Sequence, residues 1–356
     1  RKADQAPGLT SRSRHPPSCP APHLTRHRPI AASPRHQTLP PPPPPLLRSR
    51  PLHTTQTRPP SPRRPSQQHL QPGVPVRLSQ NFASTPEPAA TMVASPETIE
   101  AMTPPGYSFP DHRLRLNQSE PDREPLVLVA PGSYSPITFL HLRMAVMAAD
   151  YVRYNTNYEL VGSYLSPVSD AYKKRGLAPA CHRRRMCEIA AEQTSKFLMV
   201  DPWEAEQTAY VPTAVVLDHF EHEINVKRGG CNGKRVRIAV LAGADLINTM
   251  SQPGVWSPSD LRHILGDFGA FVLERAGVNI DEALTNLKEW EDQIYYIPQV
   301  VPNDVSSTKI RLLLRRNMSI DYLIPSQVIE YIEEHGLYTE DDATTNETGK
   351  GKEVAQ

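Results

Sequence analysis

Six short apolar segments alternate with stretches of helical periodicity, and this alternation limits the possible folds more than any other feature of the chain. The apolar segments lie at 126–130, 158–165, 196–200, 236–242, 270–274 and 294–299. The helical patterns lie at 138–152, 179–194, 208–225, 258–266, 281–289, 307–316 and 325–334. Strand–helix alternation at this spacing requires crossover connections and therefore parallel strands. We predict an α/β fold with a Rossmann-like parallel sheet and helices on both faces.

Composition divides the chain into four parts. Residues 1–91 are crowded with Pro and Arg and contain very few acids. A segment so poor in aliphatic residues cannot bury enough surface to offset its ordering entropy, so we predict that it is disordered. Residues 92–124 are expected to be a flexible segment and 125–338 a single globular domain. The polar tail, 339–356, is expected to be disordered.

Three interpretations of the leader 1–91 remain open. Its basic charge could contact nucleic acid or anionic lipid. Its Arg-rich, acid-poor composition is similar to that of a mitochondrial transit peptide, but its many prolines prevent the amphipathic helix that such peptides need. The first Met of the chain is Met92, so the segment could also be an untranslated leader, which is the interpretation we favour. None of the three assigns chemistry to the segment.

Apolar runs and cysteines exclude several classes of protein. No apolar run approaches the roughly 20 residues of a membrane-spanning helix. The 4 cysteines form no CxxC pair and no regular framework, which is typical of a reducing compartment. Cys181 and Cys187, with His182 between them, could form half of a metal site. The chain offers no second half, so we expect no metal held by the protein.

A glycine follows the first apolar segment, in the sequence Gly-Ser-Tyr-Ser-Pro-Ile-Thr-Phe-Leu-His from Gly132 to His141. Glycine after a strand lets the backbone approach a phosphate closely, and Ser133 adds a hydroxyl group. Pro136 helps to set the entry to a helix, and His141 falls about one turn inside it. The alternative is an ordinary strand–turn–helix connection with the histidine on the surface. The combined spacing favours a phosphate-binding turn.

A second motif, Ser-Ser-Thr-Lys-Ile-Arg at 306–311, opens a basic helix. A serine caps this helix, and Lys309 and Arg311 lie in its first turn. Cations at a helix N-terminus oppose the helix dipole, which is favourable only where an anion binds. The alternative is a capped amphipathic helix with Ile310 inward and the basic residues in solvent. With the first motif, the pattern predicts two helix N-termini that hold a polyphosphate.

Three further loops follow apolar segments and could complete such a site. The loop from Ser166 to Leu177 holds three consecutive cations that could contact a second phosphate. Trp203 and Trp256 lie in loops, where an indole either packs in the core or stacks on a heteroaromatic ring, with a cation–π contribution if that ring is a pyridinium. Asp245 either caps the next helix or accepts a hydrogen bond from a ribose or a cation-bound water.

The motif at 132–141 resembles the signature Gly-x-Phe-x-Pro-x-(His/Thr)-x-x-His of the nucleotidyltransferase superfamily, with Tyr134 in the aromatic position. Three further stretches make the globular part similar to the eukaryotic nicotinamide/nicotinic acid mononucleotide adenylyltransferases. These are Ser-Pro-Val-Ser-Asp-Ala-Tyr-Lys-Lys-Arg-Gly-Leu at 166–177, Gly-Ala-Asp-Leu at 243–246 and Asn-Asp-Val-Ser-Ser-Thr-Lys-Ile-Arg at 303–311. The departures, such as Tyr134 for Phe and Arg175 for Lys, are conservative.

The resemblance implies transfer of an adenylyl group from ATP, with Mg²⁺, to nicotinamide mononucleotide or its nicotinic acid analogue, forming NAD or deamido-NAD and pyrophosphate. The implied catalytic residues are His141, Lys309 and Arg311. The implied ATP-binding residues are Gly132, Ser133, Tyr134, His141, Gly243, Asp245, Ser307, Thr308, Lys309 and Arg311. The implied mononucleotide-binding residues are Ser133, Tyr134, Lys174, Trp203, Val255, Trp256, Arg275 and Asn303.

Two rival functions stay open. One is a sibling transferase with another phosphate acceptor, such as phosphopantetheine or a cytidylyltransferase substrate, although the two loop tryptophans favour a pyridine ring. The other is a non-catalytic scaffold or chaperone role, which could also be added to catalysis. We expect a homo-oligomer in the nucleus or the cytoplasm rather than the mitochondrion, with no nucleic-acid or membrane partner.

Overall fold

The computed structural model describes residues 93–275 and 280–339 of the chain. The leader 1–91 and residues 340–356 lie outside the described residues, so the expectations for them stay predictions. The strands are β1 (Glu124–Gly132), β2 (Tyr158–Pro167), β3 (Leu198–Val200), β4 (Arg237–Gly243), β5 (Ala270–Leu273) and β6 (Ile294–Ile297). The α-helices are α1 (Pro96–Met102), α2 (Phe139–Asn155), α3 (Ala180–Thr194), α4 (Thr213–Glu221), α5 (Ala244–Met250), α6 (Pro258–Leu261), α7 (Ile280–Asn286), α8 (Ser307–Arg315) and α9 (Ser326–Glu334).

The strands form one sheet in the order β3-β2-β1-β4-β5-β6, and every neighbouring pair is parallel. This confirms the predicted fold class, and each predicted strand overlaps an observed one. Two of the predicted helices contain an α-helix followed by a π-helical turn. The segments 208–225 and 258–266 end in π-helical turns, at His222–Lys227 and Arg262–Phe268, that continue α4 and α6.

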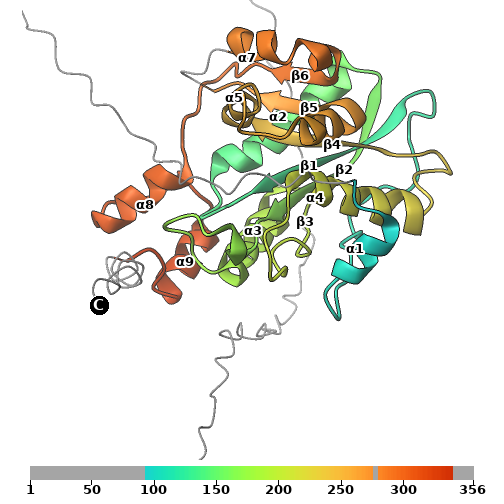
Figure 1. Cartoon of the computed structure of the whole chain (residues 1–356). Helices are drawn as coiled ribbons and strands as arrows, with labels where there is room; N and C mark the ends of the chain where they lie inside the picture. Colours follow the sequence, from blue (N-terminus) through green and yellow to red (C-terminus); the bar gives the residue numbers. More distant parts are fainter. Residues whose placement is uncertain (1–92, 276–279, 340–356) are drawn as a thin grey trace, which may run out of the picture. The chain divides into compact units, whose positions relative to one another are not determined.

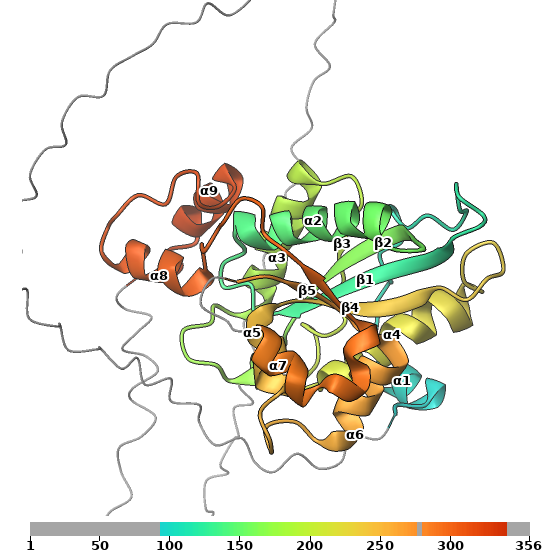
Figure 2. The same cartoon turned by 90° about the horizontal axis from the view of Figure 1, so that it is seen from above.

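The two faces of the sheet are covered by separate hydrophobic cores, because successive side chains of a strand point to opposite faces. On β1, Val127 and Val129 belong to the core beneath α4, whereas Leu126 and Leu128 belong to the core beneath α2 and α3. Figure 2 shows α2 on one side of the sheet and α1, α4, α6 and α7 on the other. A strand buried on both faces carries a continuous apolar run, as β1 does.

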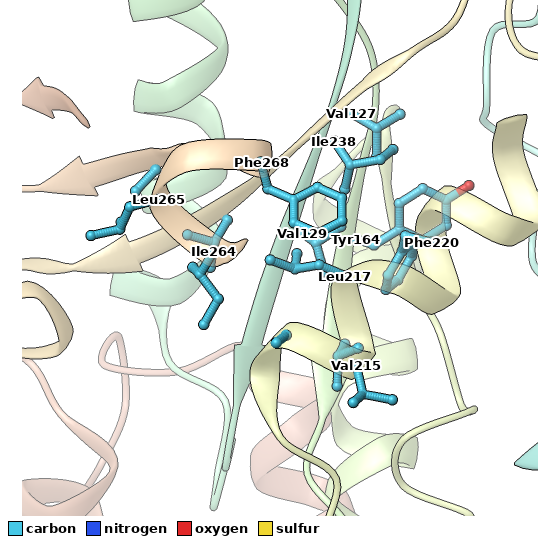
Figure 3. Packing of buried hydrophobic residues seen from close by; sticks show 14 of the residues in the cluster. Val127, Val129, Tyr164, Val215, Leu217, Phe220, Ile238, Ile264, Leu265 and Phe268 are labelled. Carbon is cyan, nitrogen blue, oxygen red and sulfur yellow. The ribbon is translucent and has the colours of Figure 1, made fainter. Parts of the chain in front are cut away.

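Figure 3 shows the first of these cores, in which Val127 and Val129 face Leu217 and Phe220 of α4. Phe268, at the end of the π-helical turn after α6, packs beside them. All of these side chains are almost fully buried. The helices of this face therefore hold β1 and its neighbours in place below the loops that follow the strands.

The segment 92–124 is not the flexible connection that its composition suggested. Residues 96–102 form α1, which Ser95 caps, and Ile99, Phe109 and Leu114 are buried in the core beneath α4. The Ala94 N–H donates to Asp218 Oδ2 at 2.8 Å and so ties the segment to α4. Its apolar residues are too widely spaced to give a clear periodicity, but tertiary packing orders them.

No helix among residues 93–275 and 280–339 is long and apolar enough to cross a membrane.

Candidate functional site

The two predicted phosphate-binding motifs are in direct contact, although about 170 residues separate them. β1 ends at Gly132 beside β4, where the strand order reverses, and α8 begins at Ser307 over the same edge of the sheet. The Ser307 hydroxyl donates to the Pro136 carbonyl at 2.8 Å, and Arg311 Nη1 donates to the Ser135 carbonyl at 2.6 Å. In open parallel sheets, ligands bind at this reversal, beyond the carboxyl ends of the strands.

His141 lies in the first turn of α2, and its hydrogen bonds determine its tautomer. The Thr138 N–H donates to His141 Nδ1 at 3.0 Å, so Nδ1 carries no proton and the neutral ring has its proton on Nε2. Burial, together with the positive charge of Arg275, lowers the pKa of His141 to about 4. The imidazole is therefore neutral near pH 7 and offers an anion a hydrogen bond from Nε2 rather than a positive charge.

The side chain of Tyr134 turns into the protein. It is 3% exposed, its hydroxyl donates to the Ala130 carbonyl at 2.6 Å, and its ring packs edge-on against His141. A Cβ on Gly132 would lie 2.8 Å from Cζ of this ring. In this conformation, only the backbone of Tyr134 remains for a phosphate. The turn therefore requires glycine at 132 for internal packing.

The predicted cations gather on the α8 side of this edge. Lys309 is exposed, and its Nζ pairs with Asp304 Oδ2 at 2.5 Å. Partial burial and the charge of Arg311 lower the pKa of Lys174, and burial lowers the pKa of Arg311. A Cβ on Gly176 would lie 3.5 Å from Arg311 Nε, so the loop after β2 packs against α8. A bound phosphate would relieve the repulsion between Lys174 and Arg311.

Gly243 and Asp245 lie at the end of β4 and the start of α5. A Cβ on Gly243 would meet no atom within 4 Å, so nothing in the described structure requires glycine there. Asp245 is exposed and forms an ion pair with Arg275, which follows β5. The open space beside Gly243 is where the backbone could approach a nucleotide, with Asp245 at its edge.

The tryptophans expected to hold the acceptor occupy different environments. Trp203 is 0% exposed, and its ring stacks on His219 with centroids 4.2 Å apart and planes 8° apart. A ligand ring could reach Trp203 only after a rearrangement, so in this structure it is a core residue. Trp256 is half-buried beside the end of α5, and its Nε1–H donates to Thr249 Oγ1 at 3.2 Å. Trp256 is therefore the more accessible of the two rings.

The remaining predicted site residues lie in loops and at the start of α8. Val255 is 49% exposed next to Trp256. Asn303 shapes the approach to α8, since its Oδ1 accepts from the Val305 N–H at 3.0 Å. Ser133 is half-buried, Ser307 is half-buried, and Thr308 is exposed at the start of α8.

Arg183 is a residue of the site that sequence reasoning missed. It is 0% exposed, and it donates to the carbonyls of Ala178 and Ser133 and to Asp170 Oδ1. It thereby fixes the phosphate-binding turn to the loop after β2. Three consecutive arginines, Arg183, Arg184 and Arg185, lie in the first half of α3. Only Arg183 faces the interior of the protein. The helical periodicity of this segment predicts which side chains face the core, and it was the signal that could have revealed the burial of Arg183.

Two buried contacts join neighbouring loops of the site. Ser135 Oγ lies 2.9 Å from the Tyr338 hydroxyl and accepts from the Ala178 N–H at 3.0 Å. Ser166, at the end of β2, donates to Glu204 Oε2 at 2.5 Å. Burial raises the pKa of Glu204 to about 8, so this carboxyl is mostly protonated at neutral pH.

Among residues 93–275 and 280–339, no three His, Cys, Asp or Glu side chains stand close enough to hold a metal ion together. Cys181 and Cys187 are free thiols on α3. The described part of the chain therefore shows no protein-held metal centre.

Comparison with known proteins finds relatives of the globular part of the chain. The sequence model of the cytidylyltransferase-like family matches residues 129–313, which include both motifs. The chain is 50% identical over 269 residues to nicotinamide/nicotinic acid mononucleotide adenylyltransferase 2 of Saccharomyces cerevisiae, covering 73% of this chain and 67% of that protein. It is 53% identical over 240 residues to the enzyme of that name from Schizosaccharomyces pombe, covering 65% of each.

A plant protein is similar over almost its whole length. The chain is 41% identical over 221 residues to nicotinamide/nicotinic acid mononucleotide adenylyltransferase of Oryza sativa, covering 61% of this chain and 88% of that protein. By contrast, the chain spans only about two thirds of the length of the two yeast proteins.

Proposed function

Because this chain belongs to the nicotinamide/nicotinic acid mononucleotide adenylyltransferase family, we propose that it transfers the adenylyl group of ATP to either mononucleotide, forming NAD or deamido-NAD and pyrophosphate. The observation that most supports this reaction is the contact between the two phosphate-binding motifs, from Ser307 to Pro136 and from Arg311 to Ser135. A polyphosphate bound there would touch two helix N-termini at once.

The proposed chemistry is a single displacement at phosphorus. A phosphate oxygen of the mononucleotide forms a bond to the α-phosphorus of ATP. The bond from that phosphorus to the oxygen bridging to the β-phosphate breaks, and pyrophosphate leaves with the electron pair. No side chain has to form a covalent bond, so the protein contributes positioning and stabilisation of the developing charge.

Different residues of the site would position the phosphates and stabilise their charge. His141 Nε2–H and the N–H groups at the start of α8 donate hydrogen bonds to phosphate oxygens, and Lys309 and Arg311 supply positive charge. Binding to a phosphate would draw Lys309 from its exposed pair with Asp304, which costs little because exposed ion pairs are weak. The open space at Gly243 and the carboxylate of Asp245 suit the adenylate ribose.

Mg²⁺ would be held mainly by the phosphate oxygens of ATP, where it would neutralise charge on the leaving group. Asp245 is the carboxylate closest in sequence to the open Gly243 backbone, but it pairs with Arg275. The described residues thus fit a metal that arrives with its nucleotide better than one held by the protein.

For the acceptor, we propose a pocket formed by Lys174, Val255, Trp256, Arg275 and Asn303, with Trp203 beneath it. Lys174 and Arg275 would bind the mononucleotide phosphate, and Trp256 would stack on the pyridine ring. Stacking and a cation at this position tolerate either an amide or a carboxylate on the ring, which is consistent with both acceptors.

We also propose a homo-oligomer in the nucleus or the cytoplasm. Support for the compartment comes from Cys181, Cys187 and Cys231, which are free thiols. Analytical ultracentrifugation and imaging of the tagged full chain would test the two parts separately.

The decisive experiment supplies the purified full chain with ATP, Mg²⁺ and one acceptor at a time. We expect NAD from nicotinamide mononucleotide, deamido-NAD from nicotinic acid mononucleotide, and one pyrophosphate per product. Phosphopantetheine with ATP and a cytidylyltransferase substrate with CTP are the rival arms. Turnover with either rival and with neither mononucleotide would overturn the proposal.

A further inference from the structure

The segment before β1 reaches the loop that carries Trp203. We call residues 93–115 the strap. The strap is held to the π-helical turn after α4, where His222 Nε2 lies 2.9 Å from Glu100 Oε1. Figures 1 and 2 both show α1, the helix of the strap, beside α4. The strap therefore has a fixed place on one face of the sheet, and its side chains can orient the residues that they contact.

Three hydrogen bonds join the strap to residues 201–207, the first part of the loop after β3. They are the Tyr107 hydroxyl to Asp201 Oδ1 at 2.8 Å, Trp203 Nε1–H to Thr103 Oγ1 at 3.4 Å, and Gln207 Nε2–H to the Met102 carbonyl at 3.1 Å. Loops at the edge of a sheet are more mobile than the strands that they follow. Contacts from outside the sheet therefore determine where this loop begins.

Asp201 is the centre of these contacts. Its side chain is 0% exposed, and Oδ2 lies 3.0 Å from His219 Nε2, which in turn lies 3.0 Å from the Tyr107 hydroxyl. A carboxylate only accepts, so Nε2 carries a proton. Burial, and then the charge of Asp201, raise the pKa of Tyr107 far above its usual range, so the phenol also keeps its proton.

The imidazole of His219 depends on this hydrogen-bond network for its orientation. Its other nitrogen, Nδ1, has no hydrogen-bond partner among the described residues. Trp203 stacks on the same ring, with centroids 4.2 Å apart. Tyr107 and Asp201 thus orient the imidazole from its Nε2 side, and through it they fix the indole that lies beneath the proposed acceptor pocket.

The loop after β3 also contacts the other side of that pocket. Ser169 Oγ donates to the Ala209 carbonyl at 3.2 Å, and Ser166 donates to Glu204 Oε2. Both serines lie at the end of β2 or just after it, in the stretch that leads to Lys174. A shift of the loop after β3 would therefore disturb both the indole beneath the pocket and the cation proposed to bind the mononucleotide phosphate.

We propose that Tyr107 is a positioning residue for the acceptor mononucleotide, which acts through Asp201 and His219 on the loop after β3. This inference rests on the proposed function, because it concerns the acceptor of that reaction. Removal of the Tyr107 hydroxyl leaves a buried carboxylate without one of its donors. The loop would then populate other conformations, and the apparent affinity for the mononucleotide would fall in proportion to the fraction that stays competent.

Two tyrosine hydroxyls that bind the strap provide a matched pair of variants. Tyr107→Phe keeps the ring, which packs edge-on against His219 with centroids 5.5 Å apart, and removes only the hydroxyl. Tyr164→Phe removes a hydroxyl that donates to the Pro110 carbonyl of the strap at 3.0 Å, rather than to Asp201. Both variants loosen the strap, but only the first changes the network around Asp201.

Steady-state kinetics of the full chain with ATP, Mg²⁺ and nicotinamide mononucleotide compare the two. In Tyr107→Phe, the KM for the mononucleotide should rise about threefold to tenfold, while kcat and the KM for ATP stay within about twofold. In Tyr164→Phe, both KM values and kcat should stay within about twofold of those of the unmodified chain. An equal rise of the mononucleotide KM in both variants would show that the strap only stabilises the fold, and the proposal would be wrong.

A double-mutant cycle tests whether Tyr107 acts through Asp201. Asp201→Asn keeps the size of the side chain and removes its charge. Adding Tyr107→Phe to Asp201→Asn should raise the mononucleotide KM by less than about twofold further, because residues in one network are not additive. If Tyr107→Phe has its full effect on top of Asp201→Asn, the two residues act independently and the proposed route is wrong.

Hydrogen–deuterium exchange separates this inference from the proposed function, because it needs no turnover. Amides of residues 201–210 should exchange about threefold faster or more in Tyr107→Phe than in the unmodified chain, and should be unchanged in Tyr164→Phe. Unchanged exchange of these amides in Tyr107→Phe would overturn the inference whatever the activity. Faster exchange confined to Tyr107→Phe would support it even if the unmodified chain transferred no adenylyl group, a result that would count against the proposed function alone.

Discussion

The phenol ring of Tyr134 lies directly against Gly132, so that a Cβ on the glycine would meet the ring at 2.8 Å. Gly243, on the neighbouring strand, has open space where its Cβ would be. The two glycines at the edge of the site therefore differ. Gly132 is required because a side chain of the protein packs against it, whereas Gly243 borders open space.

The first prediction compares these two glycines. Gly132→Ala forces the Tyr134 ring to move and should lower the free energy of unfolding by roughly 1–3 kcal/mol, as overpacking does. Gly243→Ala has an ordinary backbone, with φ of −82°, and should leave stability within about 0.5 kcal/mol. Its KM for ATP should nevertheless rise about tenfold, since the methyl group would occupy the space of the nucleotide. Melting temperatures and ATP kinetics distinguish the two, and normal ATP binding by Gly243→Ala would place the nucleotide elsewhere.

The second prediction concerns His141 and Arg311. Each supplies a donor or a charge to the transferring phosphate, and loss of one such preorganised group costs about 2–4 kcal/mol of transition-state stabilisation. Steady-state kcat for His141→Ala and for Arg311→Ala should therefore fall roughly a hundredfold to a thousandfold. Arg316→Ala, which removes an exposed cation one residue beyond α8, is the control and should keep full activity. Near-normal kcat in both variants would rule out the assigned roles.

The third prediction separates Trp203 from Trp256. Trp203 is buried against His219, so Trp203→Ala should cost about 3–5 kcal/mol of stability, as large cavities in a core do. Trp256→Ala should change stability little and raise the KM for the mononucleotide, because it removes stacking of roughly 1–3 kcal/mol. The KM for ATP should hardly change. Melting temperatures and both KM values are the measurements. A normal mononucleotide KM in Trp256→Ala would exclude this ring from the acceptor pocket.

The fourth prediction concerns Glu204, whose folded-state pKa is raised by burial to about 8. For a group with a raised pKa, the stability contribution is fully present below the unfolded value near 4.5 and is lost as pH rises towards 8. Glu204→Gln keeps an acceptor for the Ser166 hydroxyl and cannot ionise. Relative to the unmodified chain, it should gain on the order of a few kcal/mol between pH 5 and 8. Denaturant unfolding across this range measures the difference, and parallel pH curves for the two proteins would contradict it.

Several parts of this site could be predicted because they depend on local sequence. The run before Gly132 is apolar on both faces, and the structure places it between two cores as β1. The Ser306 cap of α8 is a local hydrogen bond to the Lys309 N–H. Parallel strands bring their carboxyl ends to one edge, which places both motifs at that edge. The contact itself depends on the stretch after β6, which brings α8 back to the turn after β1.

Other parts depend on which faces of the helices and strands pack together, and local patterns indicate them weakly or not at all. Segment 92–124 was expected to be flexible, yet Ile99, Phe109 and Leu114 are buried in the core beneath α4. Similarly, the packing of α3 against the sheet decides that Arg183 is buried. Arg184 instead points outward and forms ion pairs with two glutamates.

By itself, the amino-acid sequence determined the order of the six strands, most of the helices and the two motifs predicted to bind phosphate, because periodicity, glycine placement and capping act over a few residues. Only the tertiary structure decided that Tyr134 faces inward, that Trp203 stacks on His219, and that Tyr107 bonds to Asp201. These outcomes depend on contacts between segments distant in the chain. Their free energy comes from shared burial and charge, which no single segment specifies.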